Sequence, residues 1–352
     1  MRGRPGPLAL LAVAAMLSLA ACDGGSDQPS APEVAGPAAP RAAAFRVVYR
    51  IDDTAGPEAQ VATDVLQVAH PWNSRLEHRE GPPPGGAVLS STVLNQRFTF
   101  NTAQGSTGFA TRRIPGGLAS APSPEVLEAA AAVGLVDRMG ESTVAAEACT
   151  RWAYRSVNKV LAKPTAEEAV EACITSDGIP LREAITLRGK LVRVAEAVQV
   201  DRNPPVTADT FQSEVDPGND GGPALLESDQ LVTEGRQTGK DIVKLAVPKG
   251  FRASRQVTVN RQPGPGAPPV ALYVQGFEAG SDLIATEQIT TPGNPPWPAD
   301  EGQAVELGEK RRGRIVYRTG WAEVRVTVDG KAVRVTASRP VLALAVARTL
   351  TV

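Results

Sequence analysis

The chain has few of the residues that carry most enzyme chemistry. Its 352 residues include only three cysteines and two histidines, and aromatic residues make up 4%. Lysine and arginine total 37 against 38 acidic residues, so the formal net charge is −1. There is no excess of positive charge to attract nucleic acid or an anionic surface. We therefore expect no nucleic-acid partner.

Motifs of the common catalytic sites are also missing. The sequence has no G-x-S-x-G elbow and no Walker loop. His70 and His78 lie eight residues apart, and no cluster of cysteines or carboxylates supplies the third ligand of a catalytic zinc site. We interpret both as surface histidines near a turn. Glycosidase carboxylates follow no spacing rule, and nothing selects a pair here. We expect a protein that is not an enzyme and holds no cofactor.

One acidic stretch has part of a calcium-binding pattern. Asp216, Asp220, Gly221 and Glu227 occupy positions 1, 5, 6 and 12 of an EF-hand-type loop. Position 3 is a glycine, two prolines interrupt the frame, and no flanking helices are evident. A linker explains the same residues, so we expect no metal site.

What the sequence does contain is an export signal followed by a cysteine. A basic start precedes an apolar segment, residues 8–21, that is shorter than the roughly 20 residues of a membrane-spanning helix. This arrangement is typical of a secretory signal. The letters LAAC at 19–22 match the bacterial lipobox, so the chain resembles a secreted lipoprotein. The resemblance implies that residues 1–21 are removed and that Cys22 is acylated, with chains such as palmitate. An ordinary secretory signal with an incidental cysteine is the alternative.

Acylation would place the protein on the extracytoplasmic face of the cell membrane. Each buried CH2 of an acyl chain contributes about 0.8 kcal/mol to membrane binding. Residues 23–44 contain almost no large apolar side chain, so they cannot offset the entropy lost on folding. We therefore expect residues 22–44 to be a flexible tether that begins at the lipidated Cys22.

The remaining length suits two domains. Residues 215–224 are dense in glycine, proline and aspartate and predict a break. We expect a first domain at 45–215, a linker at 216–239 and a smaller second domain at 240–352.

Cys149 and Cys173 are the two cysteines of the body of the protein. Outside the cytoplasm two thiols most simply form a disulfide, and two buried free cysteines are the alternative. A bridge would close a loop of about 25 residues and stabilise the fold by roughly 3 to 4 kcal/mol in the chain-entropy model.

The first domain mixes strand and helix patterns. Ser123 and Pro124 suit the N-cap and first position of a helix at 124–137, and the capping box Thr165–Glu168 predicts a second helix at 166–173. Alternating residues predict strands before and after these helices, at 45–52, 62–70, 93–101, 181–189 and 190–200. Strands, helices and strands in this order indicate an α+β fold, with an antiparallel sheet and helices on one face.

The second domain has the clearest local signal. Residues 323–338 form two alternating segments around Asp329-Gly330, the dipeptide that a type I′ hairpin turn favours. Pro340 then begins an apolar terminal helix. We expect a small α+β domain.

Both domains resemble known families. The first is similar to the LolA-like group in its opening strands, its helical region and the letters ACITSDGIPLREA at 172–184, and Cys149 sits where relatives place the partner of the second cysteine. This implies a curved antiparallel half-barrel, with helices on the concave side and a cavity for acyl chains. The C-terminal domain resembles the small domain of RseB-type regulators, on segments 247–251, 271–288 and 319–326 and the final helix. Those regulators generally lack a lipobox, which this chain has.

The resemblances imply a non-catalytic sensor or regulator, or a lipid- or lipoprotein-binding module, with an anti-sigma factor or another membrane protein as partner. A lipid carrier without a regulatory role and a plain structural envelope lipoprotein are the alternatives. We expect an apolar inner face in the half-barrel, which would bind acyl chains without specific polar groups. No ligand-binding residue is assigned. The four tryptophans, Trp72, Trp152, Trp297 and Trp321, suit either a cavity mouth or core packing.

Overall fold

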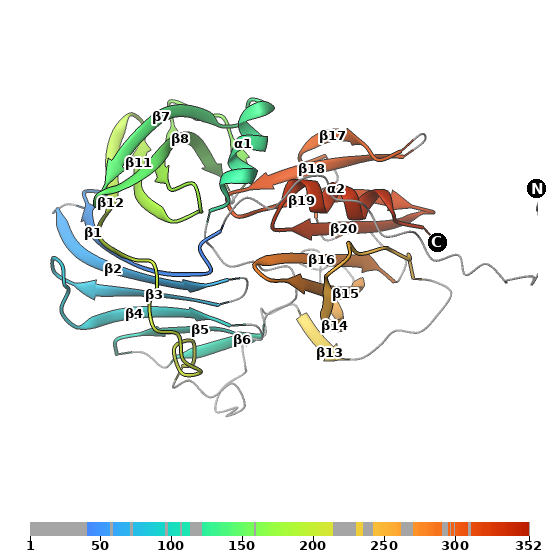
Figure 1. Cartoon of the computed structure of the whole chain (residues 1–352), viewed down its shortest axis with the longest axis horizontal. Helices are drawn as coiled ribbons and strands as arrows, with labels where there is room; N and C mark the ends of the chain where they lie inside the picture. Colours follow the sequence, from blue (N-terminus) through green and yellow to red (C-terminus); the bar gives the residue numbers. More distant parts are fainter. Residues whose placement is uncertain are drawn as a thin grey trace, which may run out of the picture.

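The computed structural model describes residues 41–351 with gaps (Figure 1). The gaps are 57–58, 71–72, 96–97, 106–107, 113–121, 158–159, 214–229, 235–241, 262–269, 291–294, 296, 299 and 309–310. The signal segment, Cys22 and most of the expected tether therefore lie outside the described residues. So do Trp72 and the acidic stretch at 216–227.

The first of two large antiparallel sheets is built from eleven of the described strands. Their spatial order is β7-β8-β10-β11-β12-β1-β2-β3-β4-β5-β6. The strands are β1 Ala44–Asp53, β2 Gln60–Ala69, β3 Asn73–Glu80, β4 Val88–Leu94, β5 Phe98–Ala103, β6 Phe109–Arg112, β7 Asp137–Val144, β8 Glu147–Val157, β10 Glu168–Ile174, β11 Pro180–Leu187 and β12 Lys190–Asp201. One end curls back on itself, because β7 and β12 are in contact without being hydrogen-bonded neighbours.

The second sheet has eight described strands in the order β13-β14-β15-β16-β20-β19-β18-β17. They are β13 Gln230–Glu234, β14 Arg252–Arg261, β15 Val270–Ala279, β16 Asp282–Ile289, β17 Gln303–Glu306, β18 Arg312–Arg318, β19 Trp321–Val328 and β20 Lys331–Ala337. The short strand β9, Val160–Ala162, pairs with both β8 and β18. Through β9 the two sheets join into one continuous sheet of 20 strands, and they lie side by side (Figure 1).

Only two helices occur among the described residues, so the predicted α+β class is wrong. They are α1, Pro124–Ala132, and α2, Pro340–Arg348, and antiparallel strands make up most of the rest. Helix α1 is not a cover for the concave side of a half-barrel. It lies at the junction of the two sheets, in contact with β18 and α2 (Figure 1).

The predicted helix at 166–173 is a strand. The hydrogen bond expected of the capping box is present, since the backbone N–H of Glu168 donates to Thr165 Oγ1 over 3.2 Å. It closes a turn that leads into β10, where Val170 and Ala172 are buried. Because β10 pairs with β8 on one side and β11 on the other, the alternation of its side chains outweighs the local helix signal.

Several other local predictions are confirmed. The strands predicted at 45–52 and 62–70 are β1 and β2, and the terminal helix is α2. Asp329 and Gly330 both have positive φ, 48° and 78°, as the central residues of a type I′ turn require. The strand predicted at 93–101 is wrong, because β4 ends at Leu94 and β5 begins at Phe98.

One hydrophobic core runs beneath both sheets. Val324 and Val335 of the second sheet belong to the same buried cluster as Leu342 of α2, Leu127 of α1 and Trp152 of β8. Helix α1 thus fixes the curled end of the first sheet against the second. Within the described ranges, neither helix has the length and apolar character needed to cross a membrane.

Two polar contacts close the same junction. Arg339, which precedes α2, donates from Nε to Glu125 of α1 over 2.8 Å. The backbone N–H of Ser123 donates to the carbonyl of Thr319, also over 2.8 Å. The junction therefore combines apolar packing with specific hydrogen bonds.

Candidate functional site

A pocket of about 320 Å³ opens on the face of the first sheet. It spans β12, β1, β2, β3 and β4, which are consecutive in the sheet. Residues that pair directly across antiparallel strands point to the same face of the sheet. Asp53 pairs with Arg193 in this way. His78 pairs with Asp64 on one side and with Ser90 on the other, so these side chains lie together on the pocket face. The lining consists of Ile51, Asp53, Gln60, Ala62, Asp64, Leu76, His78, Ser90, Thr92 and Arg193.

Asp64 is the buried charge of this pocket. Its side chain is 9% exposed. Its Oδ1 lies 2.7 Å from His78 Nδ1, and its Oδ2 accepts a hydrogen bond from Arg193 Nη2 over 3.0 Å. A buried carboxylate is stable only when it is paired and hydrogen-bonded. The Asp64 triad (Asp64, His78 and Arg193) therefore ties β2, β3 and β12 together and fixes the orientation of the His78 ring.

The pocket also has an apolar component. Leu76, on β3 beside His78, is 41% exposed although its side chain lies on the pocket face. Leu191, two residues before Arg193 on β12, is likewise exposed. Seven of the ten lining residues are nevertheless polar or charged, so the predicted apolar inner face is wrong for the part that lines this pocket.

Glu183 of β11 adds a further carboxylate near the pocket. Its side chain is exposed, yet surrounding groups desolvate it and raise its pKa, an effect that Arg193 opposes. In the described part of the chain no cation lies within ion-pair distance of it.

Tyr49 of β1 stays neutral beside these charges. Burial raises the pKa of its phenol, and the negative charges of Glu183 and Asp64 raise it further. The hydroxyl donates to the carbonyl of Pro180 over 2.6 Å. Tyr49 is thus a hydrogen-bonded support for the sheet and has no role as a base.

Asp64, His78 and Ser90 lie in a row across three strands, in the order of acid, base and hydroxyl. However, no hydrogen bond joins His78 to Ser90 among the described side chains, whereas a nucleophile has to lie within hydrogen-bond reach of its base. Nor do the described residues contain a group of three or more histidine, cysteine or acidic side chains that could hold a metal ion.

The two histidines differ in their surroundings. His70 is half-buried in a turn directly after β2, whereas His78 lies within strand β3 with its side chain 40% exposed. His78 belongs to the Asp64 triad. His70, at the end of β2, has its ring 6.3 Å from that of Phe45. Burial, followed by the charge of Arg41, lowers the pKa of His70 to about 4. It is therefore neutral and part of the packing near the junction of the sheets.

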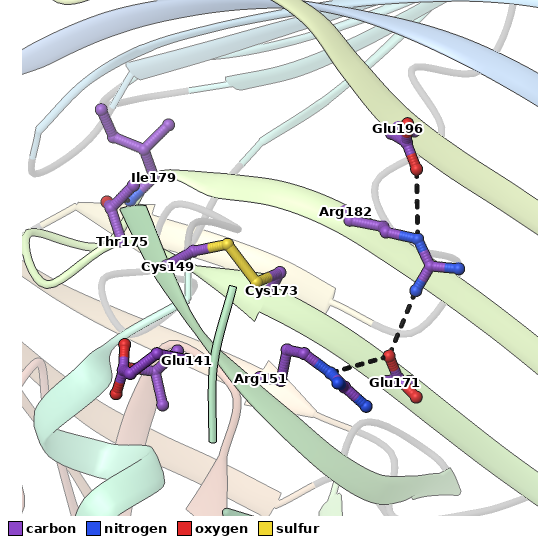
Figure 2. Close-up of a disulfide and its surroundings, with 10 residues drawn as sticks. Glu141, Cys149, Arg151, Glu171, Cys173, Thr175, Ile179, Arg182 and Glu196 are labelled. Carbon is purple, nitrogen blue, oxygen red and sulfur yellow. Dashed lines mark hydrogen bonds and ion pairs between the residues drawn. A yellow bond between two sulfur atoms is a disulfide. The ribbon is translucent and has the colours of Figure 1, made fainter. Parts of the chain in front are cut away.

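Cys149 of β8 and Cys173 of β10 are joined by a disulfide, with their Cα atoms 5.4 Å apart (Figure 2). Both are buried in the same cluster as Phe45 and Ile179. Figure 2 also shows Arg182 between two carboxylates, those of Glu171 and Glu196. The bridge thus staples two neighbouring strands of the curled end of the first sheet.

The other candidates lie elsewhere. Trp152 is buried in the core that runs beneath both sheets, Trp297 is buried in a separate cluster with Leu272, and Trp321 packs against Leu283. These three therefore serve packing. Sequence reasoning missed Asp64 and Arg193. The sequence signal that could have revealed Asp64 is a single aspartate on the inward face of the strand at 62–70, which is otherwise largely apolar.

No family model matches the chain, and no curated protein does. Among solved structures, the chain is similar to MucB in complex with MucA(peri), at 15% identity and a TM-score of 0.29, over 87% of this chain and 92% of that one. It is also similar to the Pseudomonas aeruginosa MucA/MucB complex, at 16% identity and a TM-score of 0.30, over 87% and 92%. PNGF-II matches at 7% identity and a TM-score of 0.29, over 84% and 68%. With backbones that superpose this poorly, the likenesses carry no conclusion about what the chain does.

Proposed function

We propose that the chain is an exported, membrane-tethered regulator that works by binding and not by catalysis. The observation that carries the proposal is the pocket on the first sheet, where the buried Asp64 triad lies beside the exposed Leu76. A hydrogen-bonded, buried polar group next to an accessible apolar one suits recognition of a ligand that has both characters.

The charges favour a polypeptide segment over a bare acyl chain. Each buried CH2 contributes about 0.8 kcal/mol, whereas covering a charged group with hydrocarbon costs several kcal/mol. For an acyl chain in this pocket, the free energy gained by covering Leu76 would be offset by the cost of covering the charges of Asp53 and Arg193. A peptide can satisfy those charges with its own polar groups, so a sensor or regulator is favoured over a lipid carrier.

The identity of the partner rests on the sequence resemblance to RseB-type regulators. That resemblance supports an anti-sigma factor or a similar membrane protein as partner. MucB was solved together with MucA, but the TM-scores of this match are too low to support the choice of partner. A plain structural envelope lipoprotein remains the competing function.

Photocrosslinking in the exporting cell tests the binding role. A benzophenone amino acid placed at Leu76 should capture a partner that mass spectrometry can identify. The matched control is Val61, which is 38% exposed but alternates with the lining residues Gln60 and Ala62 and so faces away from the pocket. A protein adduct at position 76 alone supports the regulator, and a lipid adduct supports the carrier. Equal or absent capture at the two positions would contradict both.

Anchoring has its own test. Replacing Cys22 with alanine removes the thiol that acylation requires, so the variant should move from the membrane to the soluble exported fraction. Fractionation followed by immunoblotting measures the change, with Cys22→Ser as a second variant. Full membrane retention of both would overturn the lipid anchor.

A further inference from the structure

A second cleft, of about 600 Å³, lies at the far end of the second sheet. Its walls are the loop between β17 and β18, the turn between β19 and β20, and the C-terminal end of α2. Leu307 and Leu350 also line the cleft, but both are buried, so they present little accessible apolar surface. The cleft is separate from the pocket on the first sheet and shares no residue with it.

Three arginines and one aspartate line this cleft. Arg311 directly precedes β18 and Arg312 is its first residue, Arg348 comes from the last turn of α2, and Asp329 comes from the hairpin turn. The lining therefore carries a formal charge of +2. Of the described carboxylates, none lies within ion-pair distance of Arg348.

The arginines differ in how firmly they are held. Arg311 is anchored, because its Nη1 donates to the carbonyl of Leu350 over 2.6 Å. Arg312 pairs with Glu306 at 3.0 Å, but both side chains are mostly exposed. Such a surface pair contributes only about 0 to 1 kcal/mol. Arg312 and Arg348 can thus turn toward a ligand at little cost.

Described residues on either side of Arg311 and Arg312 are closely packed. The N–H of Leu307 donates to the carbonyl of Arg311 over 2.8 Å, which closes the loop. A Cβ on Gly313 would lie 2.7 Å from Leu307 Cδ1 and 2.9 Å from the carbonyl oxygen of Arg325. Only glycine fits there, and this close approach holds the loop beside β19.

We propose that this cleft binds a phosphate-bearing ligand through Arg311, Arg312 and Arg348. Guanidinium groups pair with phosphate oxygens through two parallel hydrogen bonds. The lining charge of +2 matches a phosphomonoester, which carries about −1.5 to −2 at neutral pH. Ligand pockets of roughly 300 to 1,000 Å³ hold molecules much larger than an ion. A cleft of about 600 Å³ therefore has room for the organic part of a phosphate ester beside the arginines.

A phosphomonoester could be a soluble ester or the headgroup of a membrane lipid, and the test separates them. The purified full chain with Cys22→Ala, which has no acyl anchor, is titrated with glycerol 3-phosphate in a calorimeter. It is also sedimented with phosphatidylcholine vesicles that contain or lack phosphatidic acid. Binding in the first assay identifies a soluble ester, and selective binding to phosphatidic acid alone identifies a headgroup.

The double variant Arg312→Gln/Arg348→Gln should bind at least tenfold more weakly in whichever assay is positive. Both side chains are exposed, so folding should be unchanged, which circular dichroism checks. Arg252→Gln is the matched control, because Arg252 is also an exposed arginine of this sheet that pairs with a glutamate, Glu278. Absence of binding to both probes, or binding that the double variant retains, would overturn the site.

Discussion

Replacing Glu323 with glutamine should lower the free energy of unfolding by about 3 to 5 kcal/mol. The Glu323 side chain is 6% exposed and lies among three arginines of the second sheet. Its carboxylate accepts from Arg318 Nε over 2.7 Å and from Arg325 Nη2 over 2.9 Å. Without Glu323, three buried arginine side chains share only two carboxylates, those of Glu301 and Glu287. Removing one member of such a buried ion-pair network costs about 3 to 5 kcal/mol.

The same residue predicts a loss of stability in acid. Burial raises the pKa of Glu323, but Arg334, Arg318 and Arg325 together outweigh burial and lower it to about 2. The unfolded chain, with the ordinary pKa of 4.5, binds the proton first. The contribution of this carboxylate is therefore fully present above about pH 4.5 and is lost as the pH falls toward 2.

Urea unfolding at pH 7, followed by tryptophan fluorescence, measures the neutral-pH effect. Glu306→Gln is the control, because Glu306 also pairs with an arginine of this sheet but is 69% exposed. The control should lie within about 1 kcal/mol of the unaltered protein. If Glu323→Gln were no more destabilised than Glu306→Gln, the network would not be the buried structural unit described.

Removing the Cys149–Cys173 bridge should cost about 3 to 4 kcal/mol. The bridge joins residues 24 apart, and in the chain-entropy model a loop of that length restricts the unfolded state by this amount. Both cysteines are also buried, so the Cys149→Ala/Cys173→Ala variant loses some packing as well. Its urea midpoint should fall clearly below that of the oxidised protein.

Reductant provides the internal control for the disulfide. Dithiothreitol should lower the midpoint of the unaltered protein toward that of the double variant and leave the double variant unchanged. Thiol labelling of the unfolded, unreduced protein should find neither Cys149 nor Cys173 free. Labelling of both, together with a midpoint that is insensitive to reductant, would contradict the bridge.

The sequence predicted features whose causes are local. Apolar and polar residues alternate along β1, which favours a strand with one buried face. Asp329-Gly330 favours a type I′ hairpin turn because both residues adopt positive φ. The capping box at Thr165 is equally local and makes its hydrogen bond, but the neighbours β8 and β11 decide that β10 is a strand. Local signals therefore failed where pairing across the sheet outweighed them.

The candidate site could not be predicted for the same reason. Arg193 reaches Asp64 across 129 residues of sequence, and that contact exists only because β12 and β2 both neighbour β1. No spacing rule connects two residues so far apart. One helix too many was predicted because residues 166–173 form strand β10. The helix predicted at 124–137 is also shorter: α1 ends at Ala132, and Gly134, with a positive φ of 76°, lies just before β7.

The central claim is that the pocket beside the Asp64 triad is where this protein binds its partner. Native mass spectrometry of the protein purified from its exporting cell tests it most directly, by comparing the ligand or partner retained by Leu76→Asn and Val61→Asn. Both changes make an exposed apolar side chain polar on neighbouring strands, but only Leu76 lines the pocket. We predict that Leu76→Asn loses the bound species and that Val61→Asn keeps it at the level of the unaltered protein. Equal retention by the two variants would contradict the claim.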